Sequence, residues 1–258
     1  MAFELSVNLE YMFHEAGDRI EDRMAAAAAA GYSKVELFTT GGRDVPALKA
    51  ALDANGLQLV GVVADPRIQL VDVKTHDGFR AMFAQAAADA QALGCPRIVV
   101  GSGPAVPYMK RAVQLKIVTE AIASVVPVAQ AHGLTMMIEP VNTRVDHPGV
   151  LFSQTEDALA VIEGIGSPTV RLLYDIYHSI VEGEDPAQIL PRVAPLIEHI
   201  QVADAPGRGE PGSGKVDWPA MLGLLKSVGY TGLIGVECTP TGPTAEALAW
   251  FRDLAAGV

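Results

Sequence analysis

The stretch Leu134–Pro140, LTMMIEP, is a short apolar run that ends in a glutamate, and the same arrangement returns three times further along the chain. Asp175 follows VRLLY (170–174), Gln201 follows IEHI (197–200) and Glu237 follows LIGV (233–236). Successive polar ends are separated by 36, 26 and 36 residues, about the length of one strand, one helix and their loops. Short continuous apolar runs are typical of parallel strands that are covered on both faces. These segments therefore predict four consecutive strands of a parallel α/β sheet.

Strand-like and helix-like segments alternate eight times along the whole chain. The predicted strands are Leu5–Asn8, Lys34–Phe38, Gln58–Val63, Arg97–Gly101, Thr135–Glu139, Val170–Asp175, His199–Ala203 and Leu233–Glu237. The predicted helices are Ile20–Ala30, Val45–Asn55, His76–Leu93, Met109–His132, Gln154–Ile165 with Ser153 as N-cap, Pro186–Val193, Trp218–Val228 and Thr244–Ala256. A glycine directly follows seven of these helices, as is common at helix C-termini.

Eight such βα units in 258 residues predict a single (β/α)8 TIM-barrel domain over residues 1–258. We find no linker, low-complexity stretch or change of composition that would divide the chain. An open doubly wound sheet is the alternative, and a nucleotide-binding sheet of that kind would be expected to have a Gly-rich phosphate-binding turn after an early strand. Gly101-Ser102-Gly103 is a near match, but it lacks the third glycine and an immediate helix start.

Composition narrows the range of partners. The net charge is −11 and there is no run of Lys and Arg, which argues against a nucleic-acid partner. The N-terminus lacks the pattern of a signal peptide, and no stretch approaches the ~18 uncharged apolar residues of a membrane span. Cys95 and Cys238 are expected to be reduced core residues. We therefore expect a cytoplasmic protein with a small-molecule substrate, and homo-oligomer formation stays open.

In a barrel, all strand C-termini open on one face, where active sites are built. Glu139, Asp175, Gln201 and Glu237 would follow four consecutive strands there and form one arc. Their ligand atoms are all oxygens, which suit a divalent cation such as Mg²⁺ or Mn²⁺ rather than a structural zinc ion. The alternative is that each polar residue is simply a solvated strand end. That explanation is weaker for four polar residues that occupy the same position at the ends of four consecutive strands.

Three further residues are candidates for substrate binding. His178 follows Asp175 by three residues in YDIYH and is expected in the loop after the strand, where it could hold a substrate oxygen. Arg208 lies in the long loop of HIQVADAPGRGEPGSGKVDW (199–218) and could grip a carboxylate, or pair with Glu210. Asn142 could bind a substrate hydroxyl or cap a turn. Two other residues look non-catalytic, Glu36 as a structural acid inside the barrel and His147 as a surface residue.

The runs IEPVN, YDIYH, HIQVADAPGRGEPGSGKVDW and GVEC, read in this order, closely resemble the hydroxypyruvate isomerase family of xylose-isomerase-like TIM barrels. The N-terminal FELSVNLEYMF resembles the opening strand of that family. The resemblance is strong over about residues 134–240 and moderate over the N-terminal third. The chain departs from the family after the third strand, where VGVVADPRIQLVD is shorter and lacks a His-Asn-Leu-Pro-like motif.

The resemblance implies a metal-dependent isomerase of a small keto acid or sugar acid, acting through a cis-enediolate. It implies that Glu139, Asp175, Gln201 and Glu237 hold the cation, that Glu139 and Glu237 act as acid and base, and that His178 and Arg208 contact the substrate. The same site could instead serve a keto-sugar 3-epimerase, or an inactive sugar-acid binding module. An endonuclease-like activity would need several metal-binding histidines and a basic groove, which this acidic chain does not offer.

Overall fold

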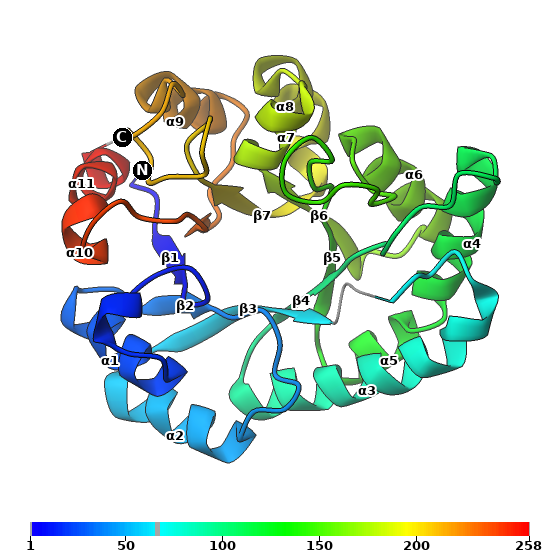
Figure 1. Ribbon diagram of the computed structural model, residues 1–258, viewed down its shortest axis with the longest axis horizontal. Coiled ribbons are helices and arrows are strands. Elements are labelled where there is room, and N and C mark those ends of the chain that lie inside the picture. Colours follow the sequence, from blue (N-terminus) through cyan, green and yellow to red (C-terminus); the bar gives the residue numbers. More distant parts are fainter. Residues whose placement is uncertain (1, 65–67, 258) are drawn as a thin grey trace.

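The computed structural model of the protein, which describes residues 2–64 and 68–257, contains eight parallel strands closed into a barrel in the order β1 to β8 (Figure 1). This confirms the predicted TIM barrel. The strands are β1 (Leu5–Asn8), β2 (Lys34–Glu36), β3 (Gln58–Ala64), β4 (Arg97–Val100), β5 (Thr135–Ile138), β6 (Val170–Asp175), β7 (Ile197–Val202) and β8 (Ile234–Val236). The barrel closes through parallel pairing of β1 with β8.

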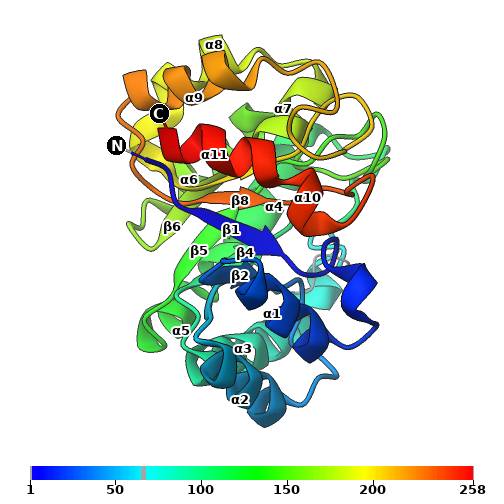
Figure 2. The same ribbon diagram turned by 90° about the vertical axis from the view of Figure 1, so that its left-hand side faces the viewer.

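The helices surround the barrel on its outside, and the two chain ends lie side by side (Figures 1 and 2). They are α1 (Ile20–Ala29), α2 (Val45–Asn55), α3 (His76–Leu93), α4 (Arg111–Ala123), α5 (Val126–Ala131), α6 (Thr155–Ile165), α7 (Ile176–Glu182), α8 (Pro186–Val193), α9 (Trp218–Ser227), α10 (Thr244–Ala247) and α11 (Ala249–Gly257). Short 3-10 turns occur at His14–Ala16, Val73–Thr75 and Ala194–Leu196. Phe3 N donates to Ala255 O at 2.9 Å and ties the two ends together.

Most predicted bounds agree with the structure to within one or two residues, but two predicted helices are divided, one N-cap differs and one helix was not predicted. The segment 109–132 forms two helices, α4 and α5, with Pro127 in the first turn of α5. The C-terminal segment also divides, into α10 and α11. Helix α6 begins one residue later than predicted and its N-cap is Gln154 rather than Ser153. The helix α7 was not predicted, because it starts directly after β6 and no loop separates the two elements.

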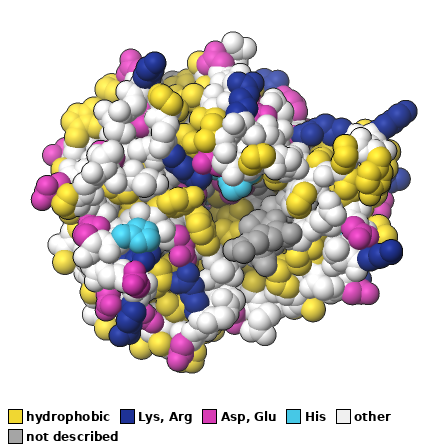
Figure 3. All heavy atoms as spheres, in the orientation of Figure 1, with side chains coloured by type: hydrophobic (Ala, Val, Ile, Leu, Met, Phe, Trp, Pro, Cys, Tyr) yellow, Lys and Arg dark blue, Asp and Glu magenta, His cyan; other side chains and the backbone are white. Residues whose placement is uncertain are grey.

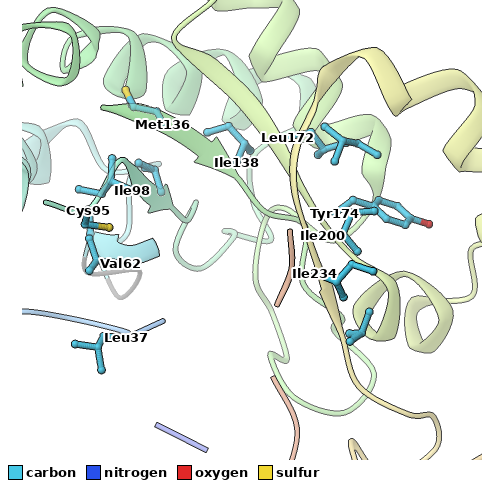
Figure 4. Close-up of a cluster of buried hydrophobic side chains, with 14 of the residues drawn as sticks. Leu37, Val62, Cys95, Ile98, Met136, Ile138, Leu172, Tyr174, Ile200 and Ile234 are labelled. Atoms are coloured by element: carbon cyan, nitrogen blue, oxygen red, sulfur yellow. The ribbon is translucent and has the colours of Figure 1, made fainter. Parts of the chain in front are cut away.

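Side chains alternate across each strand, so that the barrel has two separate apolar regions. Residues that point outward form the main core between strands and helices, and Figure 4 labels several side chains of this core, including Leu37, Ile98 and Leu172. The residues that alternate with these along each strand point inward. Among them, Val99, Met137 and Leu173 form a small cluster of their own. The loops at the C-terminal ends of the strands close over this inner region and carry the site.

By length and composition alone, residues 111–131 could cross a membrane. In the structure these residues are the two barrel helices α4 and α5, and α4 packs against α6. Arg111 at the start of α4 pairs with Asp157 of α6. The outer helices of a barrel can be as apolar as this segment. The apolar composition of residues 111–131 is therefore weak evidence for a membrane span.

Candidate active site

The four polar strand ends lie at one end of the barrel. Asp175 is the last residue of β6, Gln201 lies in β7, and Glu139 and Glu237 directly follow β5 and β8. Glu139, Gln201 and Glu237 line a cavity of about 420 Å³, and Asp175 adjoins it with a carboxylate oxygen within 4.8 Å of ligand atoms of Glu139 and His178. In the orientation of Figure 1, this face of the molecule is hollowed near its middle (Figure 3).

The carboxylate of Glu237 is held by three side chains. Asn8 Nδ2 and Gln201 Nε2 donate to Glu237 Oε2 at 2.9 and 2.8 Å, and Arg208 donates from one terminal nitrogen to Oε1 at 2.6 Å. Burial raises the pKa of Glu237 to about 8, although the Arg208 guanidinium opposes this rise. Glu237 is thus fixed in orientation and can exchange a proton near neutral pH.

Glu139 faces the same cavity from the other side of the arc. Its side chain is 15% exposed, and its Oε1 lies 4.0 Å from His178 Nε2. Burial raises its pKa well above the usual range, and the neighbouring carboxylates of Glu237 and Asp175 raise it further. A cation placed among these carboxylates would relieve their mutual repulsion.

His178 lies in the first turn of α7, not in a loop as predicted. Asp175 is the N-cap of this helix, and its Oδ1 accepts from the backbone N of His178 at 3.1 Å. The Nδ1 of His178 lies 2.7 Å from the side-chain amide of Asn142, and Nε2 lies 3.9 Å from Asp175 Oδ2. Burial lowers the pKa of His178 to about 4, so the ring is neutral at physiological pH.

This depressed pKa predicts a pH-dependent contribution to stability. Below the unfolded-state pKa of 6.5 the unfolded chain binds a proton that folded His178 does not bind until about pH 4. Lowering the pH from 6.5 to 4 should therefore destabilise the wild type relative to His178→Asn by about 3 kcal/mol. The free energy of unfolding of both proteins is measured by denaturant titration across this pH range. Titrating groups that the substitution leaves unchanged contribute equally to both proteins and drop out of the difference. Parallel pH profiles would contradict the assignment.

Arg208 lies deep in the loop between β7 and α9. Its guanidinium lies 4.8 Å from the ring centre of Tyr11 and 5.3 Å from that of Tyr177. It pairs with Glu237, and a second terminal nitrogen lies 3.6 Å from Asp146 Oδ1. The expected alternative, a pair with Glu210, is not formed, because the carboxylate of Glu210 instead accepts from Thr241.

The loop that carries Arg208 is held by a buried carboxylate. Asp204 accepts from the backbone N of Gly212 and Val216 and from Trp218 Nε1, at 2.7 to 3.1 Å. Arg208 itself has a φ of 56°, a left-handed conformation that costs free energy in a residue with a side chain. The closed loop therefore fixes the place of the guanidinium.

Asn142 shows one of its two predicted roles, and His147 makes contacts that the sequence did not suggest. The side chain of Asn142 accepts from the backbone N of Val145 and Asp146 and donates to Asp146 Oδ2, which is the turn-capping alternative. It reaches His178 but does not line the cavity. His147 is exposed, as expected, but it is not isolated: it lines the cavity and meets the His178 ring edge-to-face, with ring centres 5.4 Å apart. Nothing in its sequence neighbourhood indicated this contact, which depends on the loop after β5.

The donor set fits a hard divalent cation. Asp175 Oδ2 and Gln201 Oε1 are buried oxygens that have no hydrogen-bond donor among the described residues. Such acceptors are costly to bury without a partner, and a cation is one partner that would satisfy them. Glu139 and Glu237 add carboxylate oxygens to the same arc, and His178 could contribute a nitrogen beside Glu139 and Asp175.

Comparisons with known proteins agree with this architecture. A family model described as xylose isomerase-like TIM barrel matches residues 24–254. The chain is 34% identical to the 2-oxo-tetronate isomerase of Cupriavidus necator over 96% of both chains. It is 29% identical to the hydroxypyruvate isomerase of Escherichia coli, covering 95% of this chain and 97% of the relative.

Solved structures share the fold. A protein described as AP endonuclease, family 2, from Brucella melitensis has a TM-score of 0.90 and 27% identity, and the match covers 97% of this chain and 98% of that one. A D-psicose 3-epimerase from Clostridium cellulolyticum has a TM-score of 0.79 with 17% identity, over 98% of this chain and 92% of the other. At that identity the likeness concerns the fold alone.

Proposed function

Because this chain belongs to the xylose isomerase-like TIM barrel family and its near-full-length relatives are named as isomerases, we propose that it isomerises a small hydroxylated keto acid. Hydroxypyruvate and a 2-oxo-tetronate are the substrates that the names of these relatives suggest. The observation that carries the proposal is the convergence of Glu139, Asp175, Gln201 and Glu237 at one cavity. The single domain, the site residues and the divalent cation, Mg²⁺ or Mn²⁺, are parts of this proposal.

We assign the cation to Glu139, Asp175, Gln201 and Glu237. When bound, it would supply positive charge beside the substrate oxygens that become negative as the C–H bond next to the carbonyl ionises. The unpartnered oxygens of Asp175 and Gln201 support this assignment. Gln201 is a neutral ligand among three carboxylates, so the site keeps a net negative charge that favours a divalent ion.

The reaction moves a proton between neighbouring carbons. One of the two glutamates, Glu139 or Glu237, takes the proton from the carbon next to the carbonyl, which leaves a cis-enediolate. That glutamate, or the one opposite, returns the proton to the adjacent carbon. The hydroxyl proton passes from the oxygen that becomes the new carbonyl to the former carbonyl oxygen, and the carbonyl thereby changes place. Burial raises the pKa of both carboxyl groups, and a more basic carboxylate is better able to take a proton from carbon.

Two cavity residues are suited to hold the substrate. Arg208 offers a planar cation between two aromatic rings, and its Nε is buried without an acceptor in the described part of the chain. A substrate carboxylate would provide that acceptor. Neutral His178, held by Asn142, can direct an Nε2 hydrogen toward a substrate oxygen.

Turnover in D₂O tests the proposal directly. Candidate three- to six-carbon keto acids and keto sugars would be incubated with the cation-loaded enzyme and analysed for carbonyl position and deuterium content. A moved carbonyl with exchange at the adjacent carbon is the expected result. An unmoved carbonyl with inversion at one carbon would identify a 3-epimerase instead. Binding without any exchange would indicate an inactive sugar-acid binding module.

Removing Asp175 should remove cation binding without damage to the helix that follows. Asn retains the N-cap oxygen of α7 but loses the charge. For the wild type, Mn²⁺ at about 100 times its Kd should add about 2.7 kcal/mol of stability, a shift of at least about 5 °C in Tm. Asp175→Asn should lose most of this shift. The matched control is Asp185→Asn, the N-cap of α8, which should keep it.

A further inference from the structure

A second group of polar side chains lies inside the barrel, next to the four strand ends. Glu36 of β2 is 4% exposed, and its Oε1 accepts from Ser6 Oγ at 2.5 Å and lies 2.9 Å from His199 Nε2. TIM-barrel interiors are mostly filled by branched apolar side chains, as they are here around Val99. A buried carboxylate in this place must therefore be compensated by its neighbours.

The barrel makes room for this group. A Cβ atom at position 235 would lie 2.2 Å from Glu36 Oε1 and 2.7 Å from His199 Nε2, so any side chain there would displace Glu36 and His199 from their present positions. Glu36 also stands beside an irregularity in the β2–β3 pairing, where it lies opposite Gly61. Two glycines thus face the polar cluster, where a side chain would otherwise fill the interior of the barrel.

The cluster connects to the proposed cation site through one amide. Gln201 Nε2 donates to Glu36 Oε2 at 2.8 Å and to Glu237 Oε2 at 2.8 Å. Both amide hydrogens are therefore used, and Oε1 is left as a buried acceptor with no donor in the described chain. The two ends of an amide have nearly the same shape. Without an acceptor on the Glu36 side, only Glu237 would oppose rotation of the amide by half a turn.

We propose that Glu36 is a positioning residue, which holds the Gln201 amide so that its carbonyl oxygen, not its NH₂ group, is offered to the cation. This inference rests on the proposed function, because the cation site belongs to it. Glu36 acts through the hydrogen bond to Gln201, and Ser6 and His199 hold Glu36 in turn. Outer partners that orient the groups bound to a metal typically change its affinity 10- to 100-fold.

Two substitutions separate orientation from charge. Glu36→Asp keeps the negative charge but is one methylene shorter, so it cannot reach Gln201 while keeping both Ser6 and His199. Glu36→Gln keeps the length and loses the charge, and it places a donor where an acceptor is needed. We expect both variants to weaken Mn²⁺ binding at least about 10-fold, measured by titration of the metal-free protein and followed by the Mn²⁺ EPR signal.

The controls use another carboxylate of the same barrel. Glu198 of β7 pairs with Arg97 at 2.8 Å, near the opposite ends of the strands, and Glu198→Asp and Glu198→Gln should leave the Mn²⁺ Kd unchanged. In a Gln201→Ala background, Glu36→Asp should add less than about a 3-fold loss, because the amide it positions is gone. Ser6→Ala is a milder variant that loosens Glu36 without changing any charge, and a loss of about 3-fold or more is expected. Ser6→Ala can also test the role of Glu36 if the Glu36 variants do not fold.

The outcomes are distinct. Normal Mn²⁺ affinity in Glu36→Asp, with a loss in Glu36→Gln alone, would show that only charge matters and would overturn the positioning role. Normal affinity in Ser6→Ala, where the Glu36 variants fail to fold, would overturn it as well. A wild-type protein that binds no Mn²⁺ would instead overturn the proposed function itself, and this inference with it.

Discussion

Glu139→Gln is expected to reduce turnover by at least about 100-fold, the scale of a positioned acid or base, while the protein stays folded and still binds the cation. Gln keeps an oxygen that can face the cation, but its amide cannot accept the proton from carbon. Steady-state turnover of the keto acid identified by the D₂O screen, together with Mn²⁺ titration, measures both effects. The free energy of unfolding of the substrate-free protein should change little, because burial already disfavours the charged form of Glu139.

Glu237→Gln is expected to show a similar loss of turnover with an additional structural effect. The Glu237 carboxylate accepts from Asn8, Gln201 and Arg208, and an amide in its place cannot accept from all three donors. The Arg208 guanidinium would then lose its buried partner, which is costly. Glu198→Gln serves as the matched control and should keep wild-type turnover. Near-normal turnover in both Glu139→Gln and Glu237→Gln, with the cation bound, would contradict the acid/base assignment.

The positions of these two glutamates were predictable because the barrel itself determines them. Glu139 and Glu237 each end an apolar run at a recurring distance, and parallel strands bring such ends to one face. Eight alternating units then limited the fold to a barrel or an open sheet. The pattern predicted the end of β6 at Asp175 but not helix α7, which begins at the next residue. Asp175 both ends β6 and caps α7.

The rest of the site depends on contacts between loops that are distant in sequence. Tyr11 and Tyr177 flank Arg208 from positions 197 and 31 residues away along the chain. His147 reaches the cavity only because Asn142 caps the turn before it. No periodicity encodes these contacts, since each depends on how a loop folds over the barrel. Glu36 was predicted as a structural acid, and its bond to Gln201 becomes apparent only when the barrel is closed.

The substitution Arg208→Lys is expected to weaken binding of a keto acid by about 100-fold. The planar guanidinium lies between two aromatic rings while it donates to Glu237, and a lysine ammonium can neither stack in this way nor make two parallel hydrogen bonds. Loss of one partner from a buried, hydrogen-bonded charge pair costs about 2–5 kcal/mol. The measurement is KM for the keto acid and the inhibition constant of a small hydroxycarboxylate.

An uncharged ligand provides the control for Arg208→Lys. The amide of the same hydroxycarboxylate has nearly the same shape without the negative charge, so its inhibition constant should change much less than that of the acid. Equal losses for acid and amide would mean that Arg208 serves Glu237 rather than the substrate carboxylate. In that case kcat should fall more than KM rises, because the orientation of Glu237 is what would be lost. A selective loss for the acid, with KM rising more than kcat falls, would instead place the carboxylate of the substrate at the Arg208 guanidinium, and so make the substrate an acid rather than a neutral sugar.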